Sequence, residues 1–155
     1  MDISVMMGDS KFNMRVGALI EHDGKYLMAR SPLEECYYSV GGRVKIGETF
    51  EQAVIREVKE ETGVTVKDPK LAVIHENFFD NFEGISYHEI SVFFVIKADE
   101  QLLAVENGHK TNDGPNGEYL EWTPPLREDG ITVYPAFLQD TDLSDGSIKH
   151  IVTRE

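Results

Sequence analysis

A glycine loop followed by a short helix rich in carboxylates constrains this chain more than any other segment. From Gly42 to Val64 the residues read G-R-V-K-I-G-E-T-F-E-Q-A-V-I-R-E-V-K-E-E-T-G-V. Thr49 and Gln52 have the spacing of a capping box, and Gly63 lies where a left-handed glycine ends a helix. The sequence therefore predicts a helix over about residues 50–62, directly after the loop.

Three glutamates of this helix, Glu57, Glu60 and Glu61, are predicted to lie on one arc of its surface. At about 100° per residue, Glu57 and Glu61 fall within about 20° of Phe50. Glu60 lies about 80° from Phe50 on one side, and the apolar Val58 lies about 80° from Phe50 on the other side. The carboxylates thus flank the apolar stripe instead of opposing it. Like charges three or four positions apart destabilise a helix by about 0.2 to 0.5 kcal/mol per pair, so we expect a cation to offset them.

A bound divalent metal is one explanation of this carboxylate arc. Hard cations such as Mg²⁺ bind clustered carboxylates and keep water and substrate phosphates in their other positions. The alternative is that E-x-x-E-E is a solvated charge run on an exposed face, which is the usual meaning of such a run. That alternative gives no role to the glycine loop or to Arg56. We therefore predict a Mg²⁺ site on this arc.

The same segment resembles the Nudix box at every position that the box defines. Those positions are Gly42, Glu48, Arg56, Glu57, Val58, Glu60, Glu61, Gly63 and Val64. The resemblance implies an α/β fold, a Nudix-type α/β/α sandwich with a mixed β-sheet and the box loop and helix, as one domain over residues 1–155. One departure is Val40, where relatives commonly have proline before the two glycines. No catalytic group is lost by it.

The resemblance also implies an activity and a role for each box residue. Nudix hydrolases use Mg²⁺ or Mn²⁺ to cleave a diphosphate linkage in a nucleoside diphosphate joined to another group. Arg56 then orients a catalytic glutamate, and Glu48 belongs to the same network. Gly41 and Gly42 allow close backbone approach and so help to hold the metal or a phosphate. By position in the box, the metal ligands are Glu57, Glu60 and Glu61.

The general base of such a reaction is either one of the box glutamates or a later carboxylate. Relatives often recruit a carboxylate from a loop far beyond the box. Glu118, at the end of the polar loop 112–118, is the later residue that we select. Glu121 and Glu89 are the alternatives. For each of these three residues alone, a solvated or structural carboxylate is the simpler interpretation.

Composition limits the partners of the chain. Its 155 residues are 41% hydrophobic, which suits one domain with a real core. A formal net charge of −13 argues against a surface that binds duplex nucleic acid. Bound cations reverse the sign locally, so polyphosphate substrates stay compatible with this charge. No apolar stretch approaches the roughly 18 residues that span a bilayer, and the first residues lack the basic start of a signal peptide, so we expect a cytoplasmic protein without a membrane partner.

The identity of the substrate stays open at this level. A nucleotide-pool pyrophosphatase is the leading hypothesis, and an ADP-ribose or nucleotide-sugar pyrophosphatase is the second. Relatives that act on ADP-ribose often carry a proline well downstream of the box, whereas Pro69 lies too near and the next proline is Pro115. A catalytically silent Nudix module that senses a nucleotide is an alternative from another class. Isomerase chemistry on an isoprenoid diphosphate would need a catalytic cysteine, and the single Cys36 precedes the box loop. Nudix proteins of this size are frequently homodimers.

Alternating strands around two helices are predicted for the rest of the chain. His22, Asp23 and Gly24 have the composition of a hairpin turn. Pro135 suits the first turn of a short second helix over residues 136–139. Extended segments are expected over residues 3–6, 12–21, 25–30, 37–40, 64–66, 71–79, 85–98, 119–123 and 148–153.

Overall fold

The fold is built on one large curved sheet. The computed structural model describes residues 1–111 and 117–155. In the first half of the chain the strands are β1 Ser4–Met7, β2 Ser10–His22, β3 Lys25–Arg30, β4 Cys36–Arg43, β5 Lys70–Asp80 and β6 Ser86–Lys97. In the second half they are β7 His109–Lys110, β8 Tyr119–Thr123, β9 Thr132–Tyr134 and β10 Lys149–Arg154.

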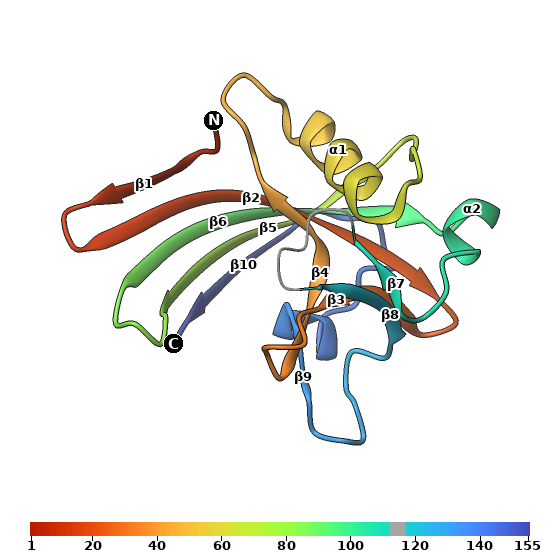
Figure 1. The fold of residues 1–155 in the computed structure, drawn as a ribbon. Helices are drawn as coiled ribbons and strands as arrows, with labels where there is room; N and C mark the ends of the chain where they lie inside the picture. Colours follow the sequence, from red (N-terminus) through yellow and green to blue (C-terminus); the bar gives the residue numbers. More distant parts are fainter. Residues whose placement is uncertain (112–116) are drawn as a thin grey trace.

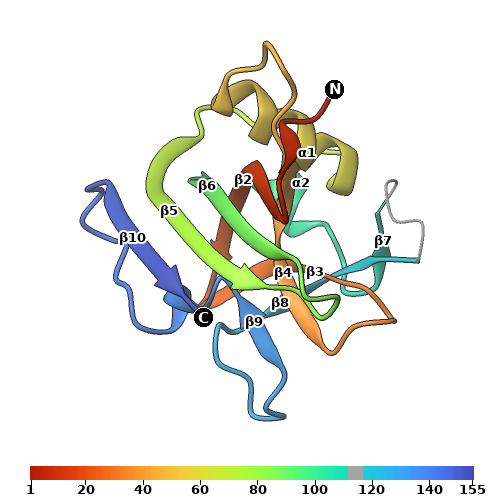
Figure 2. The ribbon, with the colours of Figure 1, turned by 90° about the vertical axis from the view of Figure 1, so that its left-hand side faces the viewer.

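The sheet is mixed, as the fold class requires. Within the described residues its order is β10-β5-β6-β2-β4-β3-β8-β7, with β1 added to β2 and β9 added to β4. Strand β2 runs parallel to β6, β10 runs parallel to β5, and β9 runs parallel to β4. The other pairs are antiparallel. Figures 1 and 2 show the long strands β5, β6 and β2 curving together beneath the helix that follows β4.

That helix, α1 Phe50–Thr62, has the predicted bounds. Thr49 accepts a hydrogen bond from the backbone of Gln52, whose side chain in turn accepts from the backbone of Thr49, so the capping box is complete. At the other end Gly63 has φ of 82°, the left-handed conformation that glycine adopts without strain. Both ends of α1 are therefore fixed by residues of the box segment itself.

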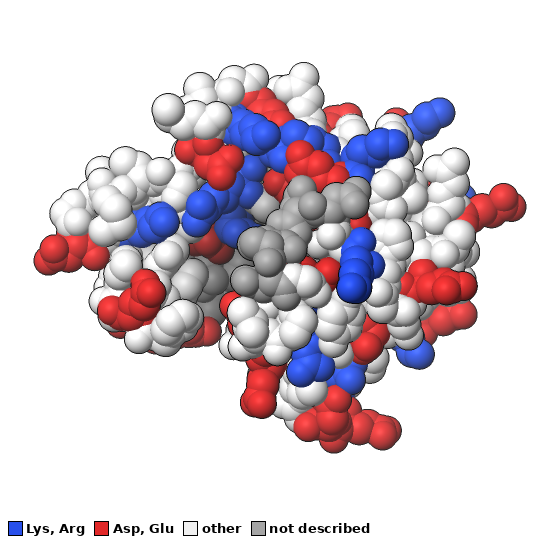
Figure 3. Space-filling model, viewed as in Figure 1, with Lys and Arg blue, Asp and Glu red and all other residues white. Residues whose placement is uncertain are grey.

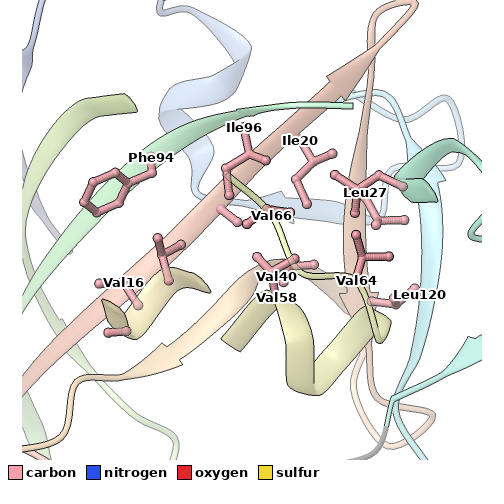
Figure 4. Close-up of a cluster of buried hydrophobic side chains, with 14 of the residues drawn as sticks. Val16, Ile20, Leu27, Val40, Val58, Val64, Val66, Phe94, Ile96 and Leu120 are labelled. Carbon is pink, nitrogen blue, oxygen red and sulfur yellow. The ribbon is translucent and has the colours of Figure 1, made fainter. Parts of the chain in front are cut away.

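Apolar side chains of α1 pack on one face of the sheet. Ala53, Val54 and Val58 of the helix are fully buried against Val16 of β2 and Val92 of β6. Figure 4 shows this cluster between the helix and the strands. Burying an apolar side chain of this size contributes about 1.5 to 3 kcal/mol, so the contact holds the helix and its carboxylates at a fixed place above β4.

The opposite face of the sheet has a smaller cover. The 3₁₀ helix η1 Ala136–Gln139 packs there through Phe137, whose ring lies 5.2 Å from that of Phe93 and 5.3 Å from that of His75. The second helix was predicted at these residues and is a single 3₁₀ turn with Pro135 at its N-cap. The expected mixed α/β fold is confirmed, with this turn as the layer opposite α1.

Some local expectations differ from the structure. Residues 64–66 are not a strand, because Val64 and Val66 bury their side chains in the core below α1 instead of pairing. The short helix α2 Glu100–Leu103 and the strands β7 and β9 were not predicted. Of the polar loop expected over 112–118, residues 112–116 lie outside the described residues. In the part of the chain that the structure describes, no helix is long and apolar enough to cross a membrane.

Candidate active site

The guanidinium of Arg56 is the centre of the candidate site. Its Nε and Nη2 donate to the two carboxylate oxygens of Glu48, at 2.6 and 2.9 Å. Its Nη1 donates to Glu57 at 2.9 Å and to Glu60 at 3.2 Å, and Nη2 also donates to the carbonyl of Arg43 at 3.1 Å. An arginine has five N–H donors, so every donor of Arg56 is used within the site.

The loop before α1 presents Glu48 to this guanidinium. The Glu48 carboxylate also accepts from the backbone N–H of Lys45 at 3.0 Å, which fixes the loop in a turn. The hydrogen bonds from Arg56 lower the pKa of Glu48 from 4.5 to about 2, and Glu48 in turn raises the pKa of Arg56. The pair is therefore fully ionised at neutral pH, and only 15% of the Glu48 side chain is exposed.

Glu57 is held against the backbone of the glycine loop. The residue is 8% exposed, although it carries a carboxylate. A Cβ atom added to Gly42 would lie 2.5 Å from Cδ of Glu57, so only glycine admits the carboxylate at this place. A Cβ at Gly41 would collide with the carbonyl of Val16 on the neighbouring strand. The two glycines thus have a steric role, and Gly42 lies directly against the carboxylate of Glu57.

The charges of this site do not balance. The guanidinium of Arg56 faces three carboxylates directly, and Glu61, half-buried on the same helix, is a fourth. The oxygen-only donor set and the close approach of Gly42 to Glu57 fit a hard divalent cation such as Mg²⁺. Among residues 1–111 and 117–155, no three acidic, histidine or cysteine side chains already converge as a metal-binding group. In the present arrangement Arg56 holds two of the candidate ligands, Glu57 and Glu60.

The three later carboxylates have different surroundings. Glu121 accepts from the hydroxyl of Tyr37 at 2.9 Å and pairs with Arg127 at 3.0 Å, so it is bound in a structural network. Glu89, on β6, accepts from Asn13 and Ser91. Glu118 has one carboxylate oxygen, Oε2, that is buried and accepts no hydrogen bond from the described part of the chain. No hydrogen bond or ion pair within the described part of the chain joins Glu118 to the box residues, so its role as a base stays a prediction.

Sequence reasoning missed the backbone carbonyl of Arg43 as a partner of Arg56. A backbone acceptor leaves no trace in residue identity, so no signal in the sequence would have found it. Sequence reasoning also gave no role to Arg15, which the sheet places directly beside Arg43. Strand β3 and the loop after it separate β2 from β4 in the chain, and a single sequence does not define the register in which β2 and β4 pair.

Comparison with known proteins agrees with this geometry. The family model of the NUDIX domain matches residues 11–128. An ADP-ribose pyrophosphatase of Methanocaldococcus jannaschii is 37% identical over 84 residues, which are 52% of this chain and 48% of that protein. A CTP pyrophosphohydrolase of Escherichia coli is 34% identical over 65 residues, which are 39% of this chain and 48% of that protein. The chain spans about half the length or less of the curated relatives it matches.

A solved structure supports the fold independently. The crystal structure of a MutT protein from Bacillus halodurans superimposes with a TM-score of 0.59 over 92% of this chain and 90% of that chain, at 20% identity. Fold and site together define a mixed α/β protein with a carboxylate-bearing helix beside a glycine loop. The chain belongs to the Nudix family, as the NUDIX domain match over most of its length shows.

Proposed function

We propose that this protein uses Mg²⁺, or Mn²⁺, to hydrolyse a diphosphate linkage in a nucleoside diphosphate derivative. The observation that carries the proposal is the network in which Arg56 binds Glu48, Glu57 and Glu60 beside Gly42. The names of the relatives support it, since they are called pyrophosphatases and pyrophosphohydrolases. A cytoplasmic location and a homodimer stay predictions.

The residues of the site have different roles in this proposal. Glu57, Glu60 and Glu61 would hold the metal, which when bound supplies positive charge for the phosphates and lowers the pKa of a bound water. Arg56 orients Glu57 and Glu60 through charge-assisted hydrogen bonds, and it keeps them within about 3 Å of one nitrogen.

The proton of the attacking water needs an acceptor. A box glutamate or Glu118 is the proposed base. The buried Oε2 of Glu118 has an open acceptor position within the described part of the chain, which suits a group that receives a proton from water. Positioning and electrostatics then supply most of the rate enhancement, as in other phosphoryl transfers.

The direct test is turnover of a substrate panel with and without EDTA. ADP-ribose and CTP belong in the panel because relatives are named for them, and NAD⁺ and nucleotide sugars extend it. Glu57→Gln and Glu60→Gln should lower kcat by about 10²-fold or more, by analogy with the loss of other charge-stabilising groups in active sites. Glu51→Gln is the matched control, since Glu51 is an exposed residue in the first turn of the same helix.

The outcomes separate the alternatives. An unchanged kcat of Glu57→Gln at saturating Mg²⁺ would refute the metal-ligand assignment. Nucleotide binding without turnover of any substrate would favour the catalytically silent sensing module. Turnover of ADP-ribose alone would select the second of the two enzymatic hypotheses over a general nucleotide-pool pyrophosphatase.

A further inference from the structure

Strand β1 is an edge of the sheet that carries exposed apolar side chains and no charge. Its residues Ser4–Met7 pair with β2 on one side, and within the described residues no strand pairs with the other side. Val5 and Met6 are 49% and 50% exposed, and Met7 is 68% exposed. In Figure 3 the surface over β1, at the left of the view, is mostly uncharged. An uncharged apolar edge favours pairing with a further strand.

The edge strand β10, by contrast, is protected against such pairing. It carries Lys149, His150 and Arg154 among its six residues. Charged side chains on an edge strand, lysine above all, oppose its pairing with another chain. Val152 of β10 is 51% exposed, as much as Val5 and Met6 of β1, so exposure alone does not distinguish the two edges. Of these two edges, only β1 has no charged residue to block pairing.

The backbone of β1 has hydrogen-bonding groups along its free edge. A two-residue turn, 8–9, joins β1 to β2, so the residues that flank the turn form a hydrogen-bonded pair and alternate residues of β1 face β2. The carbonyl of Ile3 fits this alternation, since it accepts from the backbone N–H of Met14 at 3.0 Å. The N–H and carbonyl of Met6 and the carbonyl of Ser4 therefore point away from β2. An added strand would bind to these groups.

This free edge is complementary to a second copy of itself. It runs from Ser4 to the turn at Gly8, so Met6 lies at its centre. In an antiparallel pair of β1 strands with Met6 on the two-fold axis, the two Met6 residues exchange N–H···O bonds. The carbonyl of each Ser4 then meets the N–H of Gly8 in the other copy, and each Val5 lies opposite Met7. Every exposed apolar side chain of β1 thus meets an apolar one.

The charges at the ends of this pairing are complementary. The box loop covers the outer side of the chain just before β1, where Ile3 donates to the carbonyl of Val44 at 2.8 Å. The turn of the other copy, with the exposed Asp9, would end there, beside the exposed Lys45. A carboxylate and an ammonium from different copies therefore meet at each end, in a chain whose net charge of −13 otherwise opposes self-association.

We propose that β1 is the interface of a homodimer, in which two β1 strands pair antiparallel about Met6 and join the two sheets into one. The Nudix resemblance implies no particular surface for a homodimer, so this interface is inferred from β1 alone. It goes beyond the proposed function and does not depend on catalysis. Because the paired edge is short, we expect a reversible dimer with a Kd of about 1 to 100 μM.

Sedimentation velocity from about 1 μM to about 1 mM protein, in EDTA, measures this dimerisation. Met6→Lys and Met6→Glu should each weaken it about tenfold or more, because like charges then meet on the two-fold axis. An equal mixture of the two variants should dimerise about tenfold more tightly than either alone, because lysine then meets glutamate. Val152→Lys is the matched control, since Val152 is equally exposed on β10, and it should leave the Kd within about twofold.

Hydrogen exchange of single backbone amides tests the strand pairing directly. The amide of Met6 points to the free edge, so its exchange should slow about tenfold between protein concentrations far below and far above the Kd. The amide of Val152 lies on the other edge strand, and its exchange rate should stay within about twofold over the same range. The thermal unfolding midpoint of each variant checks that the fold is kept.

A wild-type protein that stays monomeric up to about 1 mM would overturn the inference. So would a dimer that Met6→Lys leaves intact, because such a dimer uses another surface, or a mixture of the two variants that is no tighter than its components. Recovery of the dimer in the mixture excludes unfolding as the cause of the loss. A protein that dimerises as expected and hydrolyses none of the substrates would refute the proposed function and leave this interface in place.

Discussion

Replacing Glu48 by glutamine tests how much the Arg56 network contributes to the free energy of unfolding. The size of the loss should depend on pH. The pKa of Glu48 is about 2 in the folded protein, against an ordinary value of 4.5. The difference of about 2.5, at about 1.36 kcal/mol per pKa unit, corresponds to about 3 kcal/mol of folding free energy. The side chain is only 15% exposed, so solvent screens this contribution weakly.

The sign of the pH dependence follows from the lowered pKa. A carboxyl group whose pKa is lower in the folded state stabilises the fold fully above its unfolded pKa. That stabilisation declines as pH falls from 4.5 toward 2. About 2 kcal/mol should remain at pH 3.5, by the same linkage relation. Glu48→Gln lacks the ionised form, so it should be about 3 kcal/mol less stable than the wild type at pH 7 and only about 2 kcal/mol less stable at pH 3.5.

Urea denaturation between pH 7 and pH 3.5, in EDTA, measures this difference in the free energy of unfolding. Glu83→Gln is a suitable control, because Glu83 is exposed in the turn between β5 and β6, and a surface change there should stay within about 0.5 kcal/mol. A loss below about 1 kcal/mol at pH 7 for Glu48→Gln, or a loss that is the same at both pH values, would show that the ion pair does not hold the loop as described.

Three further changes test the helix and its metal site. Mg²⁺ at about 100 times its Kd should raise the free energy of unfolding by about 2.7 kcal/mol, and Glu57→Gln should remove most of this gain in the same urea titration. Gly42→Ala should weaken the affinity for Mg²⁺ about tenfold or more, because the added Cβ would lie 2.5 Å from Cδ of Glu57. The Mg²⁺ dependence of the unfolding midpoint measures this affinity, and an unchanged value would show that the carboxylate has room for the Cβ. Thr49→Ala should cost about 1 kcal/mol of stability through loss of the cap, and a cost near zero in urea denaturation would contradict the capping role.

The box helix could be predicted in detail because its signals are local. Thr49, Gln52 and Gly63 all lie within one or two turns of the helix ends that they fix. The position of Glu57 beside the apolar stripe followed from helical periodicity, and the residue is indeed 8% exposed. The role of Arg56 as a partner of Glu48 came from the family resemblance, and the hydrogen bonds at 2.6 and 2.9 Å agree with it.

Features that depend on distant pairing could not be predicted in this way. Arg15 pairs with Arg43 through the register of β2 and β4, which a single sequence does not determine. Asn77 reaches the same face as Asn13 through two further strand pairings. Residues 64–66 were expected to form a strand because valines favour extended structure, but burial beneath α1 determines their position.

The hydrogen bonds of Arg56 leave the binding of substrate phosphates to other positive charges. Because all five of its donors are used by Glu48, Glu57, Glu60 and a backbone carbonyl, Arg56 has no donor left for a substrate phosphate. The box itself has more carboxylates than cations and would repel a diphosphate. Positive charge for the substrate must therefore come from a bound metal and from other cations near the loop.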